Sequence, residues 1–212
     1  MKRFRLLLCA LVTLGAASAD AASITFNYSG IIDTVGSFDP AFISNPAGTT
    51  FSGAFTFDST AADLIPAANA GSYAASSLSL TLSGQNFSFG PSSIGISNFT
   101  GPALDQYLVS FFDVFTSLSI RLEDFQGTVF NSDALPILPP ALGPFESRFF
   151  FFQLADSDFN TLVDVNGTIT SLQCALGCSP PVPPQPVVPE PATLVLLSSG
   201  VAALAAARRR RS

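Results

Sequence analysis

The chain has 212 residues, nearly half of them apolar, and a formal net charge of −6 at pH 7. Histidine is absent and Lys2 is the only lysine, which excludes Ser-His-Asp and Cys-His catalysis and histidine-ligated zinc. Residues 20–178 hold two arginines against fourteen acidic residues, a net charge of −12, so they cannot neutralise a phosphate backbone and nucleic acid is excluded as a main partner.

The first nineteen residues have the composition of a secretory signal peptide. A basic n-region with Lys2, Arg3 and Arg5 is followed by an apolar stretch at 6–15 and an A-x-A cleavage site at Ala17-Ser18-Ala19. A second cleavage site of the same kind is Ala19-Asp20-Ala21. We therefore predict that residues 1–19 are a signal peptide and that residues 20–178 are one exported domain.

The sequence of the exported domain at 20–178 predicts mostly β-strands. Apolar residues alternate with serine, threonine or other polar residues at 24–28, 51–57, 78–82, 87–89, 94–96, 118–122 and 163–169, and short apolar runs occupy 107–112 and 148–154. Alternation with a period of two is typical of half-buried antiparallel strands. The spacing of the strands predicts a mostly β fold, an antiparallel β-sandwich, with a closed β-barrel as the alternative architecture.

Three segments interrupt the strand pattern. Residues 83–86 have the composition of a hairpin turn between two alternating stretches. Residues 61–73 contain an aspartate, a proline and a glycine, and we expect a short helical turn there. Residues 131–145 contain four prolines, which predicts a loop.

Two cysteines remain after removal of the signal peptide, in the sequence Cys174-Ala-Leu-Gly-Cys178. An exported protein meets an oxidising compartment, so a local disulfide is the leading interpretation. A redox-active pair is the alternative, although the spacing is not C-x-x-C. Two thiolates alone make a poor metal site, and no histidine completes one.

The segment from Asp156 to Asn160 has the spacing of the first ligands of a calcium loop. The EF-hand pattern then requires glycine and glutamate at positions occupied here by Thr161 and Gly167, so that motif fails. Two interpretations remain, a polar loop or a simpler calcium site formed by Asp156, Asp158, Asn160 and Asp164. We favour the loop and assign no metal or cofactor.

Glu123 and Asp124 are adjacent carboxylates, the residue types that a glycosidase uses. That chemistry requires two carboxyl groups about 5–9.5 Å apart in one cleft. Neighbours on a strand point to opposite faces, so this pair does not qualify by itself. We therefore assign no catalytic residue and expect no enzyme activity.

The C-terminal part is organised as a spacer and a membrane segment. Residues 179–188 are rich in proline and favour extended polyproline II, a semi-rigid spacer. Then follow Pro189-Glu190-Pro191, an apolar run at 192–207 and a basic cluster formed by Arg208, Arg209, Arg210 and Arg211. As a helix the run is about 24 Å long, which the snorkelling arginines extend towards the thickness of a bilayer. The arginines should stay on the cytoplasmic side.

This tail resembles the PEP-CTERM sorting signal of Gram-negative bacteria, whose three parts match residues 189–212. The resemblance implies that the membrane protease exosortase is a partner and processes the tail near Pro189-Glu190-Pro191. It also implies a transient stay in the inner membrane and delivery to the cell surface or an exopolysaccharide matrix. A plain tail anchor is the other interpretation of the same residues.

These observations predict an exported structural protein of the cell surface or extracellular matrix, associated with exopolysaccharide. The alternative is a carbohydrate-binding module, in which exposed aromatic rings stack on sugars. Without tryptophan, the aromatic residues with a polar tip are Tyr28, Tyr73 and Tyr107. A deep cleft with two facing carboxylates would instead favour an enzyme.

Overall fold

The computed structural model describes residues 21–65, 67–99 and 104–178. These residues form nine strands: β1 (Ser23–Phe38), β2 (Thr50–Asp58), β3 (Ala70–Leu82), β4 (Gln85–Phe89), β5 (Ser92–Ser97), β6 (Asp105–Phe112), β7 (Thr116–Asp124), β8 (Ser147–Ala155) and β9 (Thr161–Leu176). The predicted all-β class is confirmed. The predicted signal peptide, the proline-rich spacer and the predicted membrane segment lie outside the described residues.

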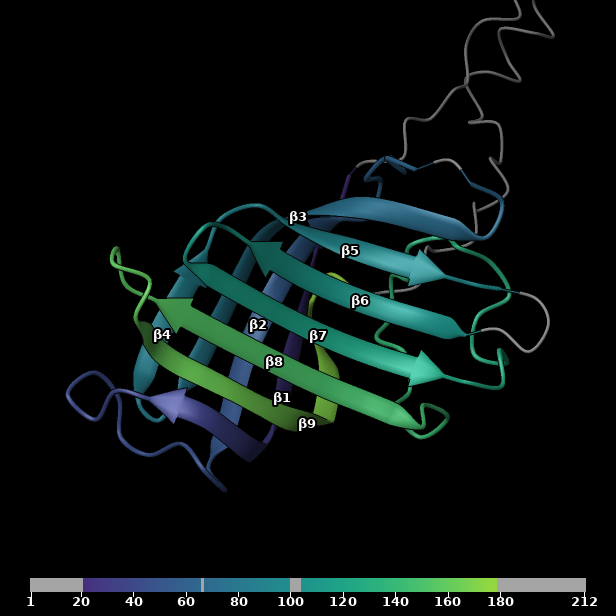
Figure 1. The fold of residues 1–212 in the computed structure, drawn as a ribbon. Helices are drawn as coiled ribbons and strands as arrows, with labels where there is room; N and C mark the ends of the chain where they lie inside the picture. Colours follow the sequence, from purple (N-terminus) through teal and green to yellow (C-terminus); the bar gives the residue numbers. More distant parts are fainter. Residues whose placement is uncertain (1–20, 66, 100–103, 179–212) are drawn as a thin grey trace, which may run out of the picture. The chain divides into compact units, whose positions relative to one another are not determined.

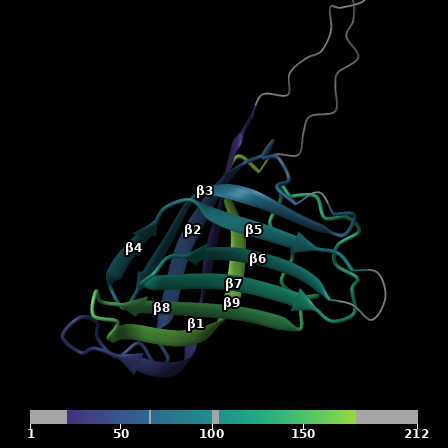
Figure 2. The same cartoon turned by 45° about the horizontal axis from the view of Figure 1, so that its top comes forward.

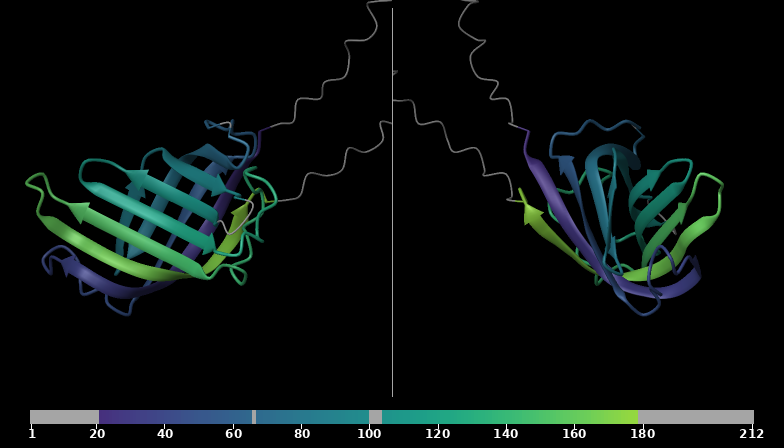
Figure 3. Two further views of the ribbon diagram at one scale, coloured as in Figure 1. Left: turned by 45° about the vertical axis from the view of Figure 1, so that its right-hand side comes forward. Right: turned by 90° about the vertical axis from the view of Figure 1, so that its left-hand side faces the viewer.

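Eight of the strands close into an antiparallel β-barrel in the order β2-β1-β9-β8-β7-β6-β5-β3, because β3 also pairs with β2. The predicted antiparallel β-sandwich is therefore wrong, and the alternative architecture, the barrel, is confirmed. The ring is flattened into two layers of strands, which Figures 1 and 3 show from different sides. β4 lies outside the ring and pairs with the second half of β3 (Figure 2).

The ring closes because three strands are long enough to belong to both layers. β1 and β9 have 16 residues each and β3 has 13. β3 pairs with β5 through Ala70–Ala75 and with β2 through Ala75–Leu82. Alternation tells which residues of a strand point inwards, but it does not reveal that one strand bends from one layer to the other. This is why the sequence pattern favoured two separate sheets.

Two glycines allow β1 and β9 to approach closely where they bend. A Cβ atom at Gly30 would overlap the carbonyl oxygen of Thr168 and the ring of Phe51. A Cβ atom at Gly167 would overlap the carbonyl oxygen of Ile31. The Phe51 ring fills the space that the two glycines leave and stacks on Phe150, with 3.9 Å between ring centroids.

The interior of the barrel is packed with aromatic and branched side chains. The alternating residues predicted to face inwards are buried, among them Phe26, Phe55, Phe57, Leu78, Leu80, Leu82, Ile94, Ile96, Leu118, Ile120, Leu122, Val163, Val165 and Ile169. Phe26 contacts Phe55 and Phe57 edge-on, with ring centroids 5.5 and 5.2 Å apart. Every buried core side chain of the described residues lies between Ile24 and Leu172, so the body up to residue 178 contains this core.

Two of the three interrupting segments were predicted correctly. The turn between β3 and β4 consists of Ser83 and Gly84, both with positive φ, so the hairpin is tighter than expected. Residues 131–145 form a loop, as predicted. The helical turn expected within 61–73 is not found among the described residues there, which form coil, bends, a turn and the start of β3 at Ala70. Asp63 accepts hydrogen bonds from the backbone N–H groups of Ile65 and Ser72, which fixes a turn against that strand.

The end of β9 is tied by a disulfide between Cys174 and Cys178. The bond encloses the last residues of the strand and the glycine after it, Gly177, which has a φ of +77°. It lies beside the start of β1, since Thr25 pairs with Leu176.

Candidate functional site

The carboxylates that the sequence singled out, Glu123 and Asp124, lie buried at the end of β7. Asp124 is opposite Asp105 of β6, and both side chains are at most 1% exposed. Glu123 accepts a hydrogen bond from the side-chain amide of Gln106 at 3.1 Å and forms an ion pair with Arg121. The sequence pattern did not reveal Asp105, because a lone aspartate at the start of a strand carries no recognisable pattern.

The two opposed aspartates bind the loop that connects β7 and β8. Asp105 Oδ2 accepts hydrogen bonds from the backbone N–H groups of Val129 at 2.9 Å and Phe130 at 2.7 Å. Asp124 Oδ2 accepts from the backbone N–H of Thr128 at 2.6 Å and from its hydroxyl at 2.9 Å. The Thr128 backbone hydrogen bond is the main cause that lowers the pKa of Asp124. Both carboxylates are therefore placed to hold the loop.

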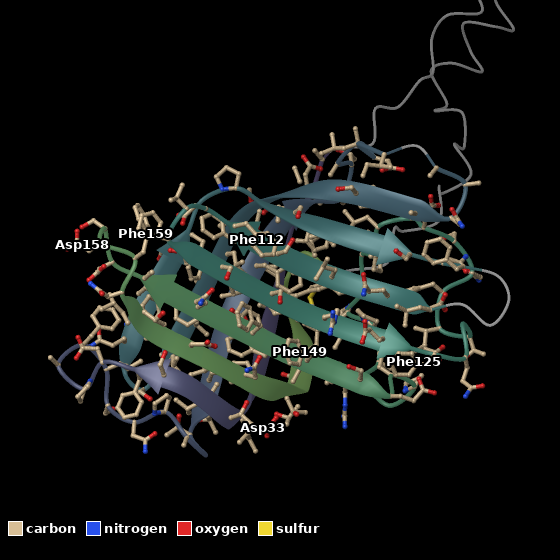
Figure 4. All side chains as sticks on the ribbon, in the orientation of Figure 1. Asp33, Phe112, Phe125, Phe149, Asp158 and Phe159 are labelled. Atoms are coloured by element: carbon tan, nitrogen blue, oxygen red, sulfur yellow. A yellow bond between two sulfur atoms is a disulfide. The ribbon has the colours of Figure 1, made fainter. Side chains whose placement is uncertain are left out.

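A polar groove on the outside of the barrel is the best candidate for a binding site. It has a volume of about 510 Å³ and lies where β1, β8 and β9 run side by side. Its lining includes Asp33, Glu146, Arg148, Phe149, Asn166 and Thr168. Figure 4 shows Asp33 and Phe149 on the same face of the barrel.

Local irregularities of the strands place these side chains. Asp33 is the extra residue of a β-bulge in β1, between the pairs Ile32–Gly167 and Thr34–Asn166. Its Oδ2 accepts a hydrogen bond from the Thr168 hydroxyl at 2.6 Å, which fixes the carboxylate at the edge of the groove. A bulge re-aims a side chain that regular alternation would place elsewhere. The alternating sequence pattern did not predict that Asp33 lies at this groove.

Both arginines of the barrel gather near this groove. Arg148 is exposed and lines it, while the guanidinium of Arg121 lies over the Phe149 ring, 5.2 Å from its centroid. Glu146 accepts a hydrogen bond from the Phe125 N–H at 2.9 Å. The groove thus combines an aromatic ring with carboxylate, amide, hydroxyl and guanidinium groups. This set of groups can hydrogen-bond a polyhydroxylated ligand while one apolar face rests on the ring.

The segment predicted as a polar loop or simple calcium site, Asp156 to Asn160, forms the turn between β8 and β9. Asp156 Oδ1 accepts hydrogen bonds from the backbone N–H groups of Asp158 and Asn160, both at 2.9 Å. The side-chain amide of Asn160 also contacts Asp156 and is the main cause that lowers the pKa of this carboxyl. Across the described ranges, no three histidine, cysteine or acidic side chains gather as metal ligands.

The tyrosines considered for sugar stacking face the core and are not on the surface. Tyr28 and Tyr107 are at most 1% exposed, and burial raises the pKa of both phenols. The Tyr28 hydroxyl donates a hydrogen bond to the Ser79 carbonyl oxygen at 2.6 Å. Tyr73 is buried as well and its hydroxyl donates to the Asp133 carbonyl. The exposed rings belong to phenylalanines, including Phe112, Phe125 and Phe159, which the sequence pattern did not separate from the core.

Comparison with protein families identifies the C-terminal tail. Residues 187–211 match the PEP-CTERM protein-sorting motif, so the predicted sorting signal is confirmed. The matched range contains Pro189-Glu190-Pro191 and Arg208–Arg211. Comparisons with curated proteins and with solved structures gave no significant match. The described part of the chain holds no helix long and apolar enough to cross a membrane.

The sorting motif implies that the protein is exported, is processed by exosortase and is sorted to the cell surface. It says nothing about what the barrel does at its destination. That role has to be inferred from the barrel itself.

Proposed function

We propose that the barrel is a non-catalytic structural component of the cell surface or of an exopolysaccharide matrix. The observation that carries the proposal is the sorting motif at 187–211 on a chain whose described residues form one closed, tightly packed barrel. The buried carboxylates support a structural role, because Asp105 and Asp124 accept hydrogen bonds from a loop of the same barrel. A net charge of −12 on residues 20–178 favours solubility and a hydrated surface.

Delivery depends on the sorting motif, and this can be tested directly. Replacing Pro189, Glu190 and Pro191 together by alanine should leave the full-length protein in the inner membrane, because exosortase loses its recognition site. The measurement is the intact mass of the protein recovered from the membrane and from the cell surface. As a control, alanine at Pro183 and Pro184 in the spacer should leave processing unchanged. A released wild-type protein that still carries Arg208–Arg211 would contradict the proposal.

A second candidate function, carbohydrate binding, is favoured by the groove between β1, β8 and β9. Phe149 supplies an aromatic face, and Asp33, Asn166 and Arg148 surround it with hydrogen-bonding groups. Stacking of an apolar sugar face on a ring, with hydrogen bonds at its edge, is a common basis of ligand binding in an open groove. Binding to a neutral or weakly charged polysaccharide would hold the protein in a matrix.

Phe149 and Phe151 offer a matched pair for testing this candidate. Both point outwards from β8 and both are partly exposed, but only Phe149 lines the groove. If the groove binds polysaccharide, Phe149→Ser should reduce retention on immobilised host exopolysaccharide by about tenfold, the equivalent of one lost stacking contact of ~1.4 kcal/mol. Phe151→Ser should bind like the wild type. Equal binding by both variants would show that any sugar site lies elsewhere. The structural role would then not involve this groove.

A further inference from the structure

A cluster of exposed apolar side chains lies at one end of the barrel, at the tips of the β6–β7 and β8–β9 hairpins. Phe112, Val114 and Phe159 are 68%, 73% and 68% exposed, and Phe115 is 37% exposed. We refer to these four residues as the tip cluster. Figure 4 shows Phe159 at one end of the molecule, and Val114, Phe115 and Phe159 border one hollow there. Exposed apolar side chains that gather in one patch often mark an interaction surface.

The tip cluster has the chemical features of a site for an extended, proline-rich peptide. The Phe115 and Phe159 rings are tilted against each other by 47°, with centroids 5.4 Å apart, and they border a hollow of about 220 Å³. Ser117, Gln153 and Thr161 also line this hollow and carry hydrogen-bond donors. Polyproline II segments bind in this way, because their rings pack on aromatic faces while their unpaired backbone carbonyls accept hydrogen bonds.

The backbone at Phe159 indicates that the ring is held in a strained position. Its φ of +62° lies in the left-handed region, where glycine is the usual residue and a bulky side chain is rare. The turn is held by the hydrogen bonds to Asp156 and by the Phe159 N–H, which donates to the Asp156 carbonyl at 3.0 Å. Strained residues persist only where the surrounding structure holds them, and they cluster at binding and active sites. Here the strained residue presents an aromatic ring to solvent.

The chain itself contains a segment of the matching chemistry. Residues 179–188 have the sequence Ser-Pro-Pro-Val-Pro-Pro-Gln-Pro-Val-Val. With three residues per turn, a polyproline II helix would align Pro180, Pro183 and Pro186 on one face, and Pro181 and Pro184 on the next. The segment carries no charge. It therefore tolerates the aspartates at the hairpin tips, Asp113, Asp156 and Asp158, which would repel an anionic lipid or an anionic polymer.

The chain enters the segment at the end of β9 that lies away from the tip cluster. The segment follows Cys178 beyond the end of β9, whereas Phe159 precedes the start of that strand, and the two ends of β9 lie at opposite ends of the barrel (Figure 3). β9 has 16 residues, or about 50 Å along its path, while ten residues of polyproline II span about 31 Å. This length does not limit docking on a neighbouring molecule.

We propose that residues 179–188 of one molecule dock on the tip cluster of the next, so that the exported protein assembles head to tail. The acceptor surface is the tip cluster, whereas the donor is the chain that follows Cys178, so the two halves of the contact are different. Heterologous contacts of this kind need not form a closed ring and can extend into open chains. The spacer then links the molecules of a surface layer after exosortase has removed the sorting tail. The proposal does not require that the barrel binds polysaccharide.

The test compares two exported forms of the protein, one ending at Val188 and one ending at Cys178. Both contain the whole barrel core, and circular dichroism and thermal melting verify that each is folded. Sedimentation velocity over a wide concentration range measures assembly. The form ending at Val188 should grow into larger species as its concentration rises, and the form ending at Cys178 should remain a monomer.

Two substitutions in the longer form locate the acceptor surface. Phe159→Gly removes the ring and suits the positive φ, so the barrel should stay folded while assembly is lost. Phe125→Ala removes a ring that is 57% exposed near the opposite end, and assembly should be retained. Mixing the Phe159→Gly variant of the longer form with the wild-type form ending at Cys178 should give only a 1:1 complex, since each supplies one half of the contact.

Three results would overturn the proposal. Equal assembly of the two forms would show that the proline-rich segment is not involved. Unchanged assembly of the Phe159→Gly variant would exclude the tip cluster. The absence of any concentration-dependent species, up to the solubility limit, would exclude the interaction between copies. The same result is expected if the segment binds to its own barrel instead, and it would overturn the proposal in that case too.

Discussion

Replacing Gly30 by alanine is expected to lower the free energy of unfolding by about 3 kcal/mol, or the melting temperature by ~6–12 °C. The added methyl group would overlap the backbone carbonyl of Thr168, which cannot rotate away, as well as the Phe51 ring. Relief requires that β1 and β9 separate at the point where both bend between the layers. That movement would also disturb the stacked pair of Phe51 and Phe150 in the core.

Gly90 is the matched control for this substitution. It lies between β4 and β5, is exposed, and has no heavy atom within 4 Å of the position that an added methyl group would take. Gly90→Ala should leave the melting temperature unchanged or raise it slightly, because alanine restricts the unfolded chain more than glycine does. Thermal melts followed by circular dichroism compare the two variants. Equal melting temperatures would show that the close crossing of β1 and β9 does not limit stability.

Removal of the Asp105 carboxylate is expected to release the loop between β7 and β8. Asp105→Ala leaves the Phe130 N–H without its acceptor and the Val129 N–H with only the longer hydrogen bond to Asp124 Oδ2 at 3.1 Å, which costs about 2 kcal/mol, or ~4–8 °C in melting temperature. Hydrogen exchange at these two amides should accelerate more than exchange in the strands. Protection that stays at the wild-type level would show that the carboxylate does not hold the loop.

The Asp105→Asn variant tests whether the hydrogen-bond acceptor or the negative charge of Asp105 holds the loop. The amide oxygen can accept the same two hydrogen bonds, and the amide nitrogen replaces Oδ1, which is buried and has no partner among the described residues. The repulsion between Asp105 and Asp124 also disappears. We therefore expect the asparagine variant to retain most of the stability that the alanine variant loses. If both variants were equally unstable, the charge would matter more than the hydrogen bonds.

The pH dependence of the same loop follows from Asp124. Hydrogen bonds, above all from the Thr128 N–H, hold the pKa of Asp124 below its ordinary value in the folded protein. The group therefore stabilises the fold fully above the unfolded pKa of ~3.9, and this contribution is lost as the pH falls through the lower folded pKa. The melting temperature of an Asp124→Asn variant should consequently fall less between pH 5 and pH 3 than that of the wild type.

The sequence alone determined the local features of this protein. Alternation identified the inward face of nearly every strand, as in Leu78, Leu80 and Leu82, because burial on one face of a sheet imposes a period of two. The turn at Ser83-Gly84 was recognisable because a two-residue hairpin requires residues that accept positive φ. The sorting tail was recognisable because it is a linear signal for processing by exosortase, so no fold is needed to display it.

Only the tertiary structure decided how the strands close and which side chains meet. Closure depends on the bends of β1 and β9, where Gly30 and Gly167 allow a contact between residues far apart in sequence. The groove depends on the bulge at Asp33, and the loop depends on Asp105, each of which finds its partners across strands. The pattern marked Phe159 as one more apolar residue in a phenylalanine-rich chain. Its position at a hairpin tip, with a positive φ and an exposed ring, follows from the fold, because exposure is a property of how the strands pack and not of the residue itself.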